Sequence, residues 1–171
     1  MYLLHFPFPP VPIETWAERM ADAVEEGLVG AAGVSNCDTA QMRRAQKALA
    51  RRGIPLACNE VEYGLLNRRP ERTGLLAACA HLGVTLIAYR PLAMGSLLRR
   101  HGELQGLLGR IGAAHGDRSV AQVALNWVIC KGAIPIPGAT SAQHVKENAG
   151  ALGWKLDEEE IAALDAASAR Y

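Results

Sequence analysis

Short apolar runs alternate along the chain with longer segments in which apolar residues recur at helical spacing. Glycine or proline bounds each run, as is typical of buried strands, and each longer segment has the pattern of a helix that covers a sheet. The predicted strands occupy residues 1–6, 29–34, 54–63, 84–89 and 133–136. The predicted helices occupy residues 13–28, 38–52, 72–82, 103–115, 119–131 and 141–152, and a last one begins at Asp157.

The spacing of the strands indicates the fold class. The first four start near Tyr2, Val29, Leu56 and Val84, a period of about 27 residues with a helix between each pair. This alternation requires parallel strands joined by right-handed crossovers. A (β/α)8 barrel takes about 250 residues, or roughly 31 per unit, so a chain of 171 residues holds about five units. We therefore predict an α/β fold, a partial (β/α)8 TIM barrel of about five β/α units. A doubly wound sheet is less favoured, because no G-x-G-x-x-G follows the first strand.

Composition excludes several classes of function. Half of the residues are hydrophobic and 20% are charged, as in ordinary globular domains. A formal net charge of +1 provides no basic surface for nucleic acid. The sequence has neither an apolar run of about 18 residues nor a signal-peptide pattern, so we expect a cytoplasmic protein with no membrane partner. The cysteines at 37, 58, 79 and 130 lie far apart without a C-x-x-C pair, which predicts buried thiols and no metal site.

The stretch from 133 to 148 has the pattern of an anion site. A short buried strand ends at Gly138, where backbone can approach a ligand closely, and Thr140 or Ser141 then caps a helix. We expect unpaired backbone N–H groups at this helix start to point outward and to suit a phosphate. An ordinary capped strand-to-helix loop has the same pattern, and this segment alone does not decide between the two.

Polar residues stand at or near the C-terminal ends of the predicted strands. In a (β/α)8 barrel the active site is built at that end, so these positions are candidates for binding or catalysis. They are His5, Ser35, Asn36, Glu60, Tyr89 and Gly138.

A series of motifs links these candidates in order along the chain. They are Leu-Leu-His-Phe-Pro at 3–7, Gly-Val-Ser-Asn at 33–36, Asn-Glu-Val-Glu-Tyr at 59–63, Ile-Ala-Tyr-Arg-Pro-Leu-Ala at 87–93, Ala-Gln-Val-Ala-Leu-Asn-Trp at 121–127, Ile-Pro-Ile-Pro-Gly at 134–138 and Glu-Asn at 147–148. With them the chain resembles the C-terminal portion of the aldo-keto reductase family, from about the fourth barrel strand onward. The resemblance implies a single aldo-keto reductase-like domain over residues 1–171, with the N-terminal strands of the barrel absent.

The resemblance also implies an activity. Members reduce aldehydes or ketones by hydride transfer from NADPH, which they bind without a Rossmann domain. His5 matches the residue that orients and polarises the substrate carbonyl, and Phe6 matches a residue that lines the substrate pocket. The ending at 153–157 is similar to subfamilies that act on small aldehydes, pyridoxal or sugars, so we expect a small carbonyl substrate.

The cofactor contacts are implied residue by residue. Ser35 and Asn36 match the residues that bind the nicotinamide carboxamide, a group with both a donor and an acceptor. Tyr89 matches the aromatic residue on which the nicotinamide ring stacks. The positions that match the pyrophosphate loop are Arg90, Leu92 and Gly95. Those that match the 2′-phosphate and adenine sites are Gly138, Thr140, Ser141, His144, Glu147 and Asn148.

Three positions depart from the family pattern. Glu60 stands where members usually have Gln, which places a negative charge near the nicotinamide. Gly138 and His144 stand where many members have Lys and Arg, so the 2′-phosphate loses partners that distinguish NADPH from NADH. We therefore expect NADPH as cofactor and regard NADH as possible.

The family's general-acid Tyr, with the Asp and Lys that tune its pKa, belongs to the strands that this chain lacks. Since general acid catalysis contributes about 10²–10⁴-fold, we expect a catalytically incomplete reductase. The alternative is a non-catalytic half-barrel that binds a ligand or pairs with another chain. Exposed barrel edges at residues 2–5 and 134–136 would then promote self-association.

Overall fold

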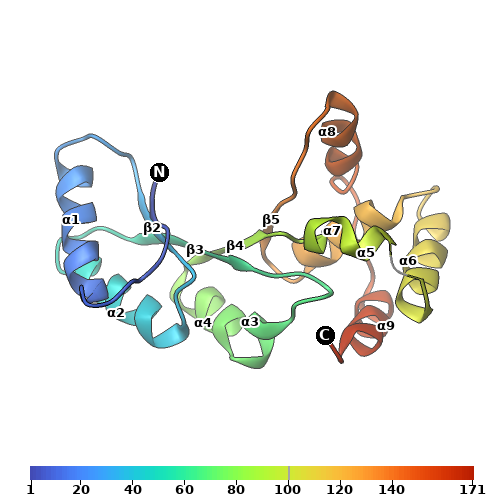
Figure 1. The fold of residues 1–171 in the computed structure, drawn as a ribbon, viewed down its shortest axis with the longest axis horizontal. Helices are drawn as coiled ribbons and strands as arrows, with labels where there is room; N and C mark the ends of the chain where they lie inside the picture. Colours follow the sequence, from blue (N-terminus) through green and yellow to red (C-terminus); the bar gives the residue numbers. More distant parts are fainter. Residues whose placement is uncertain (100) are drawn as a thin grey trace. The chain divides into compact units, whose positions relative to one another are not determined.

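A computed structural model of the chain describes residues 1–99 and 101–171. The strands are β1 (Tyr2–Leu4), β2 (Ala32–Ser35), β3 (Leu56–Glu62), β4 (Thr85–Tyr89) and β5 (Ile134–Ile136), and they form one sheet in the order β1-β2-β3-β4-β5 (Figure 1). β2 pairs in parallel with both β1 and β3. The strands therefore lie in the sheet in the same order as along the chain, as in a barrel. In a doubly wound sheet the strand order reverses at a switch point. The predicted parallel α/β fold is confirmed.

The described helices lie between the strands along the chain and after β5. They are α1 (Ile13–Glu25), α2 (Thr39–Ala50), α3 (Arg69–Arg72), α4 (Leu75–Leu82), α5 (Ser96–Arg99), α6 (Glu103–Ala114), α7 (Val120–Cys130), α8 (Ala142–Ala149) and α9 (Glu158–Ser168), with a 3₁₀ turn, η1, at Ala93–Gly95. Asp38, Ser119 and Asp157 each form a capping box at the start of α2, α7 and α9.

Three features of the helices differ from the prediction. The helix expected at 72–82 begins at Leu75, because Gly74 takes a left-handed φ of +71° as its N-cap, and the short helix α3 before it was not predicted. The helix expected to reach residue 152 ends at Ala149. The turn and helix at 93–99 were not predicted. In the part of the chain that the structure describes, no helix is long and apolar enough to cross a bilayer.

The chain divides into two compact units. The first contains Met1–Val61 and Pro70–Ile87, and the second contains Glu62–Arg69 and Ala88–Tyr171. The expectation of one domain, incomplete at its N-terminus, stays a prediction.

In the first unit, α1 and α2 pack against each other and bury apolar residues such as Met20 and Met42. Gly33 of β2 permits a close approach of the strands, because a Cβ there would lie 2.5 Å from both Cys58 Sγ and Leu3 Cδ2. The end of α2 is tied to α1 by Arg52.

Arg52 predicts an acid-dependent loss of stability in this helix pair. Its guanidinium contacts Asp22 Oδ1 at 2.6 Å and Glu25 Oε1 at 2.7 Å, and these hydrogen bonds lower the pKa of both carboxyl groups. A lowered folded-state pKa contributes stability above the unfolded value, near about pH 4, that is lost as pH falls through the folded value. We expect Arg52→Ala to be less stable than wild type at neutral pH and to lose less stability on acidification.

Urea denaturation at a series of pH values between neutral and strongly acidic tests this expectation. The neighbouring Arg51→Ala is the matched control, because Arg51 is exposed and should leave the pH profile unchanged. Parallel profiles for wild type and Arg52→Ala would contradict the assignment of these carboxylates as partners of Arg52.

In the second unit, α6 packs against α7 and α9. Trp127 of α7 is fully buried and lies with its ring centroid 5.5 Å from that of Tyr63. Around Trp127 lies a charged group of side chains that we call the Asp165 cluster. It consists of Arg68, Trp127, Lys131, Asp165 and Ser168. The cluster connects α9 to α7 and to the segment that follows β3.

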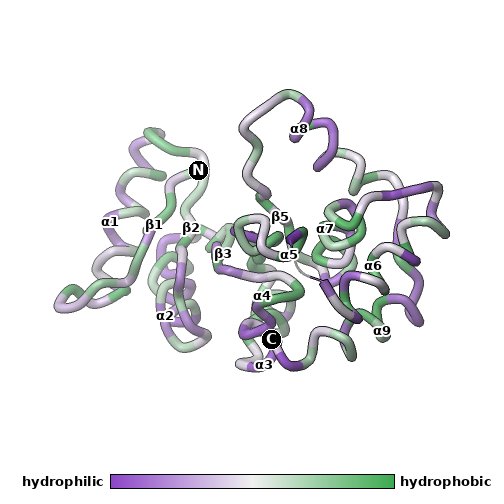
Figure 2. Tube along the Cα trace, turned by 45° about the vertical axis from the view of Figure 1, so that its right-hand side comes forward, coloured by the Kyte–Doolittle hydropathy of each residue, from purple (hydrophilic) through white to green (hydrophobic). Residues whose placement is uncertain are grey.

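Both edge strands of the sheet carry exposed apolar residues. β1 and β5 are the two ends of the strand order, and Tyr2 and Ile134 are each 54% exposed. Figure 2 shows α8 as largely hydrophilic, and this helix buries none of its residues.

Candidate cofactor site

The first unit brings four of the predicted site residues together at the ends of β1, β2 and β3. Ser35, the last residue of β2, donates its hydroxyl proton to the Glu60 carbonyl over 2.9 Å, and the backbone N–H of Asn36 donates to the same oxygen over 2.9 Å. The side-chain amide of Asn36 donates to Ser35 Oγ at 2.9 Å and to the His5 carbonyl at 3.1 Å. The polar ends of three neighbouring strands are therefore joined by one hydrogen-bond network.

The backbone of Asn36 explains why an asparagine follows Ser35. Its φ of +57° lies in the left-handed region, which asparagine tolerates better than most residues other than glycine. This turn directs the amide back toward the ends of β1 and β2, where the two hydrogen bonds described above hold it.

The hydroxyl of Ser35 keeps acceptor capacity. A serine hydroxyl has one proton and two lone pairs, and Ser35 uses the proton on Glu60 and one lone pair on Asn36. One further hydrogen bond can be accepted there, and a primary amide can donate it. The residues present therefore fit a carboxamide group such as that of a nicotinamide.

His5 and Phe6 lie just beyond the end of β1. Their rings are 4.5 Å apart, and Phe8 stacks on Phe6 at 5.1 Å. His5, Phe6 and Phe8 are all exposed, so this aromatic group is accessible to a ligand. A catalytic role for His5 and a pocket role for Phe6 stay predictions.

Glu60 lies beside Ser35, because the register pairs these two residues across β2 and β3. The pKa of the Cys58 thiol is raised to about 11, mainly by burial and secondly by the negative charge of Glu60. Burial also raises the pKa of Cys37 to about 12 and that of Cys79 to about 11, so these three thiols are protonated and unreactive at neutral pH.

Sequence reasoning overlooked Asn59, the residue before Glu60. Asn59 is fully buried, and its side-chain amide donates to the Cys37 carbonyl over 2.9 Å. Asn59 stands in the same motif as Glu60, but a buried Asn inside a strand gives no signal of its role without knowledge of its partner. Among the described residues, no group of three or more His, Cys, Asp or Glu side chains could hold a metal ion.

The second unit contains the remaining predicted residues. Tyr89 ends β4, and the Arg90 guanidinium lies 5.8 Å from the centroid of its ring and 4.0 Å from a Glu62 carboxylate oxygen. Arg90 has a left-handed φ of +49°, and Gly95 has one of +77°. The loop that follows β4 is thus a tightly wound turn. The Gly95 N–H donates to the Leu92 carbonyl over 3.0 Å.

The predicted anion site at the start of α8 is partly corrected. Ser141, rather than Thr140, is the N-cap and accepts the His144 N–H at 3.2 Å. The Thr140 N–H does not point outward unpaired, since it lies 3.4 Å from His144 Nδ1, and the Thr140 hydroxyl lies 3.2 Å from the same atom. The Thr140 N–H at this helix start is therefore already paired, and phosphate binding there stays a prediction.

The other two residues of this group differ in their contacts. The Glu147 carbonyl accepts from Gln122 Nε2 of α7 over 3.0 Å, which ties α8 to α7. Asn148 is half-buried, and Gly138 has open space where a Cβ would stand. The structure thus groups His5, Ser35, Asn36 and Glu60 in the first unit, and Thr140, Ser141 and His144 in the second.

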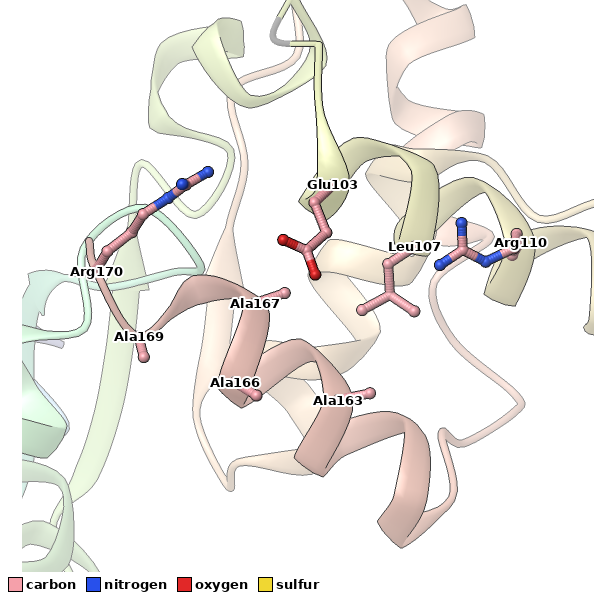
Figure 3. Close-up of a pocket in the computed structure, with 8 residues that line it drawn as sticks. All are labelled: Glu103, Leu107, Arg110, Ala163, Ala166, Ala167, Ala169 and Arg170. Atoms are coloured by element: carbon pink, nitrogen blue, oxygen red, sulfur yellow. The ribbon is translucent and has the colours of Figure 1, made fainter.

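A groove of about 470 Å³ lies between α6 and α9 (Figure 3). Glu103, Leu107 and Arg110 line it from α6, and the alanines at 163, 166 and 167 line it from α9. None of the predicted site residues lines this groove.

Comparison with known proteins identifies relatives over nearly the whole chain. The family model described as Aldo/keto reductase family matches residues 1–169. The chloroplastic pyridoxal reductase of Arabidopsis thaliana is 38% identical over 172 residues, which cover 88% of this chain and 47% of the relative. The chain thus spans about half the length of this relative.

Solved structures give the same result. A thermostable aldo-keto reductase in complex with the inhibitor epalrestat superposes with a TM-score of 0.84 at 36% identity, over 96% of this chain and 58% of that one. An aldo/keto reductase from Klebsiella pneumoniae, solved with NADP and acetate, has a TM-score of 0.80 at 36% identity, over 98% of this chain and 58% of that one. The predicted partial-barrel architecture agrees with these structures.

Proposed function

Because this chain belongs to the aldo/keto reductase family, we propose that it binds NADPH and contributes to the reduction of small aldehydes or ketones by hydride transfer. The observation that carries the proposal is the network at the ends of β1, β2 and β3. There Ser35 retains an acceptor position beside the Asn36 amide, in a geometry that suits a nicotinamide carboxamide.

In this proposal, three residues at strand ends hold the nicotinamide end of the cofactor. Ser35 and Asn36 bind the carboxamide, and Tyr89 provides the aromatic face on which the ring stacks. When bound, the cofactor supplies the hydride. His5 donates a hydrogen bond to the substrate carbonyl and orients it, while Phe6 bounds the substrate pocket.

The phosphate end is held by backbone and short polar side chains. Arg90, Leu92 and Gly95 follow the pyrophosphate, and the start of α8 offers the helix dipole to the 2′-phosphate. Thr140, Ser141 and His144 contact that phosphate, and Glu147 and Asn148 contact the adenine. Because neither Lys nor Arg stands at 138 or 144, NADH competes better than it would against a charged site.

Proton donation is the weak step for the 171 residues alone. Tyr63 is fully buried against Trp127, so its hydroxyl is not accessible to donate a proton to a substrate. We propose that these residues bind the cofactor but turn over substrate about 10²–10⁴-fold more slowly than a form with a positioned general acid. Buried, reduced thiols also suit a reducing compartment such as the cytoplasm.

A reductase assay tests this function. NADPH oxidation by the purified chain is followed with pyridoxal and with a generic aldehyde such as 4-nitrobenzaldehyde, alongside NADPH binding. We expect saturable binding with little turnover. A folded chain that binds no NADPH would contradict the proposal, and rapid turnover would contradict the expected lack of a general acid.

A second candidate is a pairing module. It is favoured by the exposed apolar residues on each sheet edge, namely Tyr2 of β1 and Ile134 and Ile136 of β5. Unpaired strand edges with exposed apolar side chains promote association. Sedimentation that shows a concentration-dependent dimer without NADPH binding would favour this candidate, and a monomer at all concentrations would exclude it.

Glu60→Gln is predicted to change which oxidation state of the cofactor binds better. A carboxylate near the nicotinamide favours the cationic oxidised ring over the neutral reduced ring. We expect the ratio of the NADP⁺ to the NADPH dissociation constant to rise by about 3–10-fold when the charge is removed. Glu26→Gln, an exposed position in the same unit, is the control. An unchanged ratio would place Glu60 away from the nicotinamide.

A further inference from the structure

Asn59 is a buried polar side chain that has no role among the cofactor contacts proposed above. It is fully excluded from solvent, and its Nδ2 donates to the Cys37 carbonyl over 2.9 Å. Its Oδ1 has no hydrogen-bond partner among the described residues. A leucine of similar size would avoid this unpaired acceptor, so the amide is not explained by packing alone.

The register of the sheet places the Asn59 side chain on the opposite face from Ser35 and Glu60. Asn59 pairs with Val34 and Glu60 pairs with Ser35, and successive residues of a strand point to opposite faces. Glu60 and Ser35 therefore share one face, while Asn59 faces the other, toward the turn that joins β2 to α2. It reaches that turn without occupying the cofactor face.

The carbonyl that Asn59 holds belongs to the residue next to Asn36. Asn36 has a φ of +57°, a left-handed conformation that asparagine tolerates but that still costs free energy, so contacts around the turn stabilise it. The turn is held at Asn36 by the Glu60 carbonyl, at Cys37 by Asn59, and at Asp38 by the capping box of α2. The bond from Asn59 is the one side-chain restraint from β3 on this turn among the hydrogen bonds described above.

We infer that Asn59 is a positioning residue for the nicotinamide end of the cofactor. By fixing the Cys37 carbonyl it holds Asn36 in its left-handed conformation, and thereby aims the Asn36 amide at Ser35 Oγ and the His5 carbonyl. The inference rests on the proposed function, since it assigns Asn59 to the same site. Loss of the bond lets the turn relax and disorders the carboxamide-binding pair.

Two ligands separate positioning from general stability. NADPH engages both ends of the proposed site, whereas 2′-phospho-ADP-ribose is the same molecule without its nicotinamide. We expect Asn59→Leu, which removes the donor and the unpaired acceptor together, to weaken NADPH binding at least tenfold. Its affinity for 2′-phospho-ADP-ribose should stay within twofold of wild type. Gln46→Ala is the control, because it removes a comparable amide-to-carbonyl bond, to Leu82, elsewhere in the first unit.

The outcomes are distinct. If the wild-type chain binds neither ligand, the proposed function fails and the inference fails with it. If wild type binds NADPH and Asn59→Leu binds it equally well, or loses both ligands equally, the positioning role is wrong while the proposed function stands. Should Asn59→Leu fail to fold, Asn59→Ser, whose hydroxyl is too short to replace the amide, is titrated with the same two ligands and judged by the same outcomes.

Discussion

We expect replacement of Asp165 with alanine to lower the free energy of unfolding by about 3 kcal/mol, because it removes a carboxylate that contacts two partly buried cations. Asp165 Oδ1 accepts the Trp127 indole N–H at 3.0 Å and lies 3.2 Å from an Arg68 nitrogen, while Oδ2 lies 2.8 Å from Lys131 Nζ. The side chains of Arg68 and Lys131 are only 13% and 18% exposed, so water replaces the lost partner poorly.

Urea denaturation measures the change in the free energy of unfolding, and two further variants show which property of Asp165 causes it. Asp165→Asn keeps the shape and an acceptor for Trp127 but not the charge, so we expect an intermediate loss. Glu159→Ala, at an exposed position on the same helix, should cost less than about 1 kcal/mol. If Asp165→Ala were no more destabilising than Glu159→Ala, the Asp165 cluster would contribute nothing to the docking of α9.

Ser35→Ala is expected to raise the NADPH dissociation constant by about 10–100-fold, the equivalent of about 1–3 kcal/mol for buried polar groups left unpaired. Ser35 is only 1% exposed, and its hydroxyl connects the Glu60 carbonyl to the Asn36 amide. Alanine removes the acceptor proposed for the carboxamide and also releases Asn36, so both residues of the pair are affected.

Fluorescence titration with NADPH measures the effect, and circular dichroism establishes that the variant is folded. Thr15→Ala removes a hydroxyl from an exposed position on α1 of the same unit and should leave the dissociation constant unchanged. Equal affinity of wild type and Ser35→Ala would move the carboxamide site away from the end of β2.

Features set by neighbours in the sequence were predictable. The strands at 84–89 and 133–136 and the helices that start after Asp38 and Asp157 lie within a few residues of their expected positions. The reason is local: an N-cap side chain bonds a backbone N–H three residues away, as Asp38 does with Gln41, so its signal is complete within one turn. The parallel sheet was predictable because the repeat of a strand followed by a helix can be read directly along the chain.

Features set by residues distant in the sequence were not predictable. The bond from Asn59 spans 22 residues and depends on a register shift between β2 and β3 that no local pattern indicates. Even between residues four apart, the pairing of the Thr140 N–H with His144 Nδ1 was not predictable, because it depends on the conformation of the His144 side chain. Arg68 and Asp165, 97 residues apart, meet only once the second unit has folded.

Titration of the wild-type 171-residue chain with NADPH, followed by quenching of tryptophan fluorescence, tests most directly whether this chain binds the cofactor. We expect saturable binding with one NADPH per chain, weakened by Ser35→Ala and unaffected by Thr15→Ala. A chain that is folded by circular dichroism but shows no saturable binding of NADPH or NADH would contradict it.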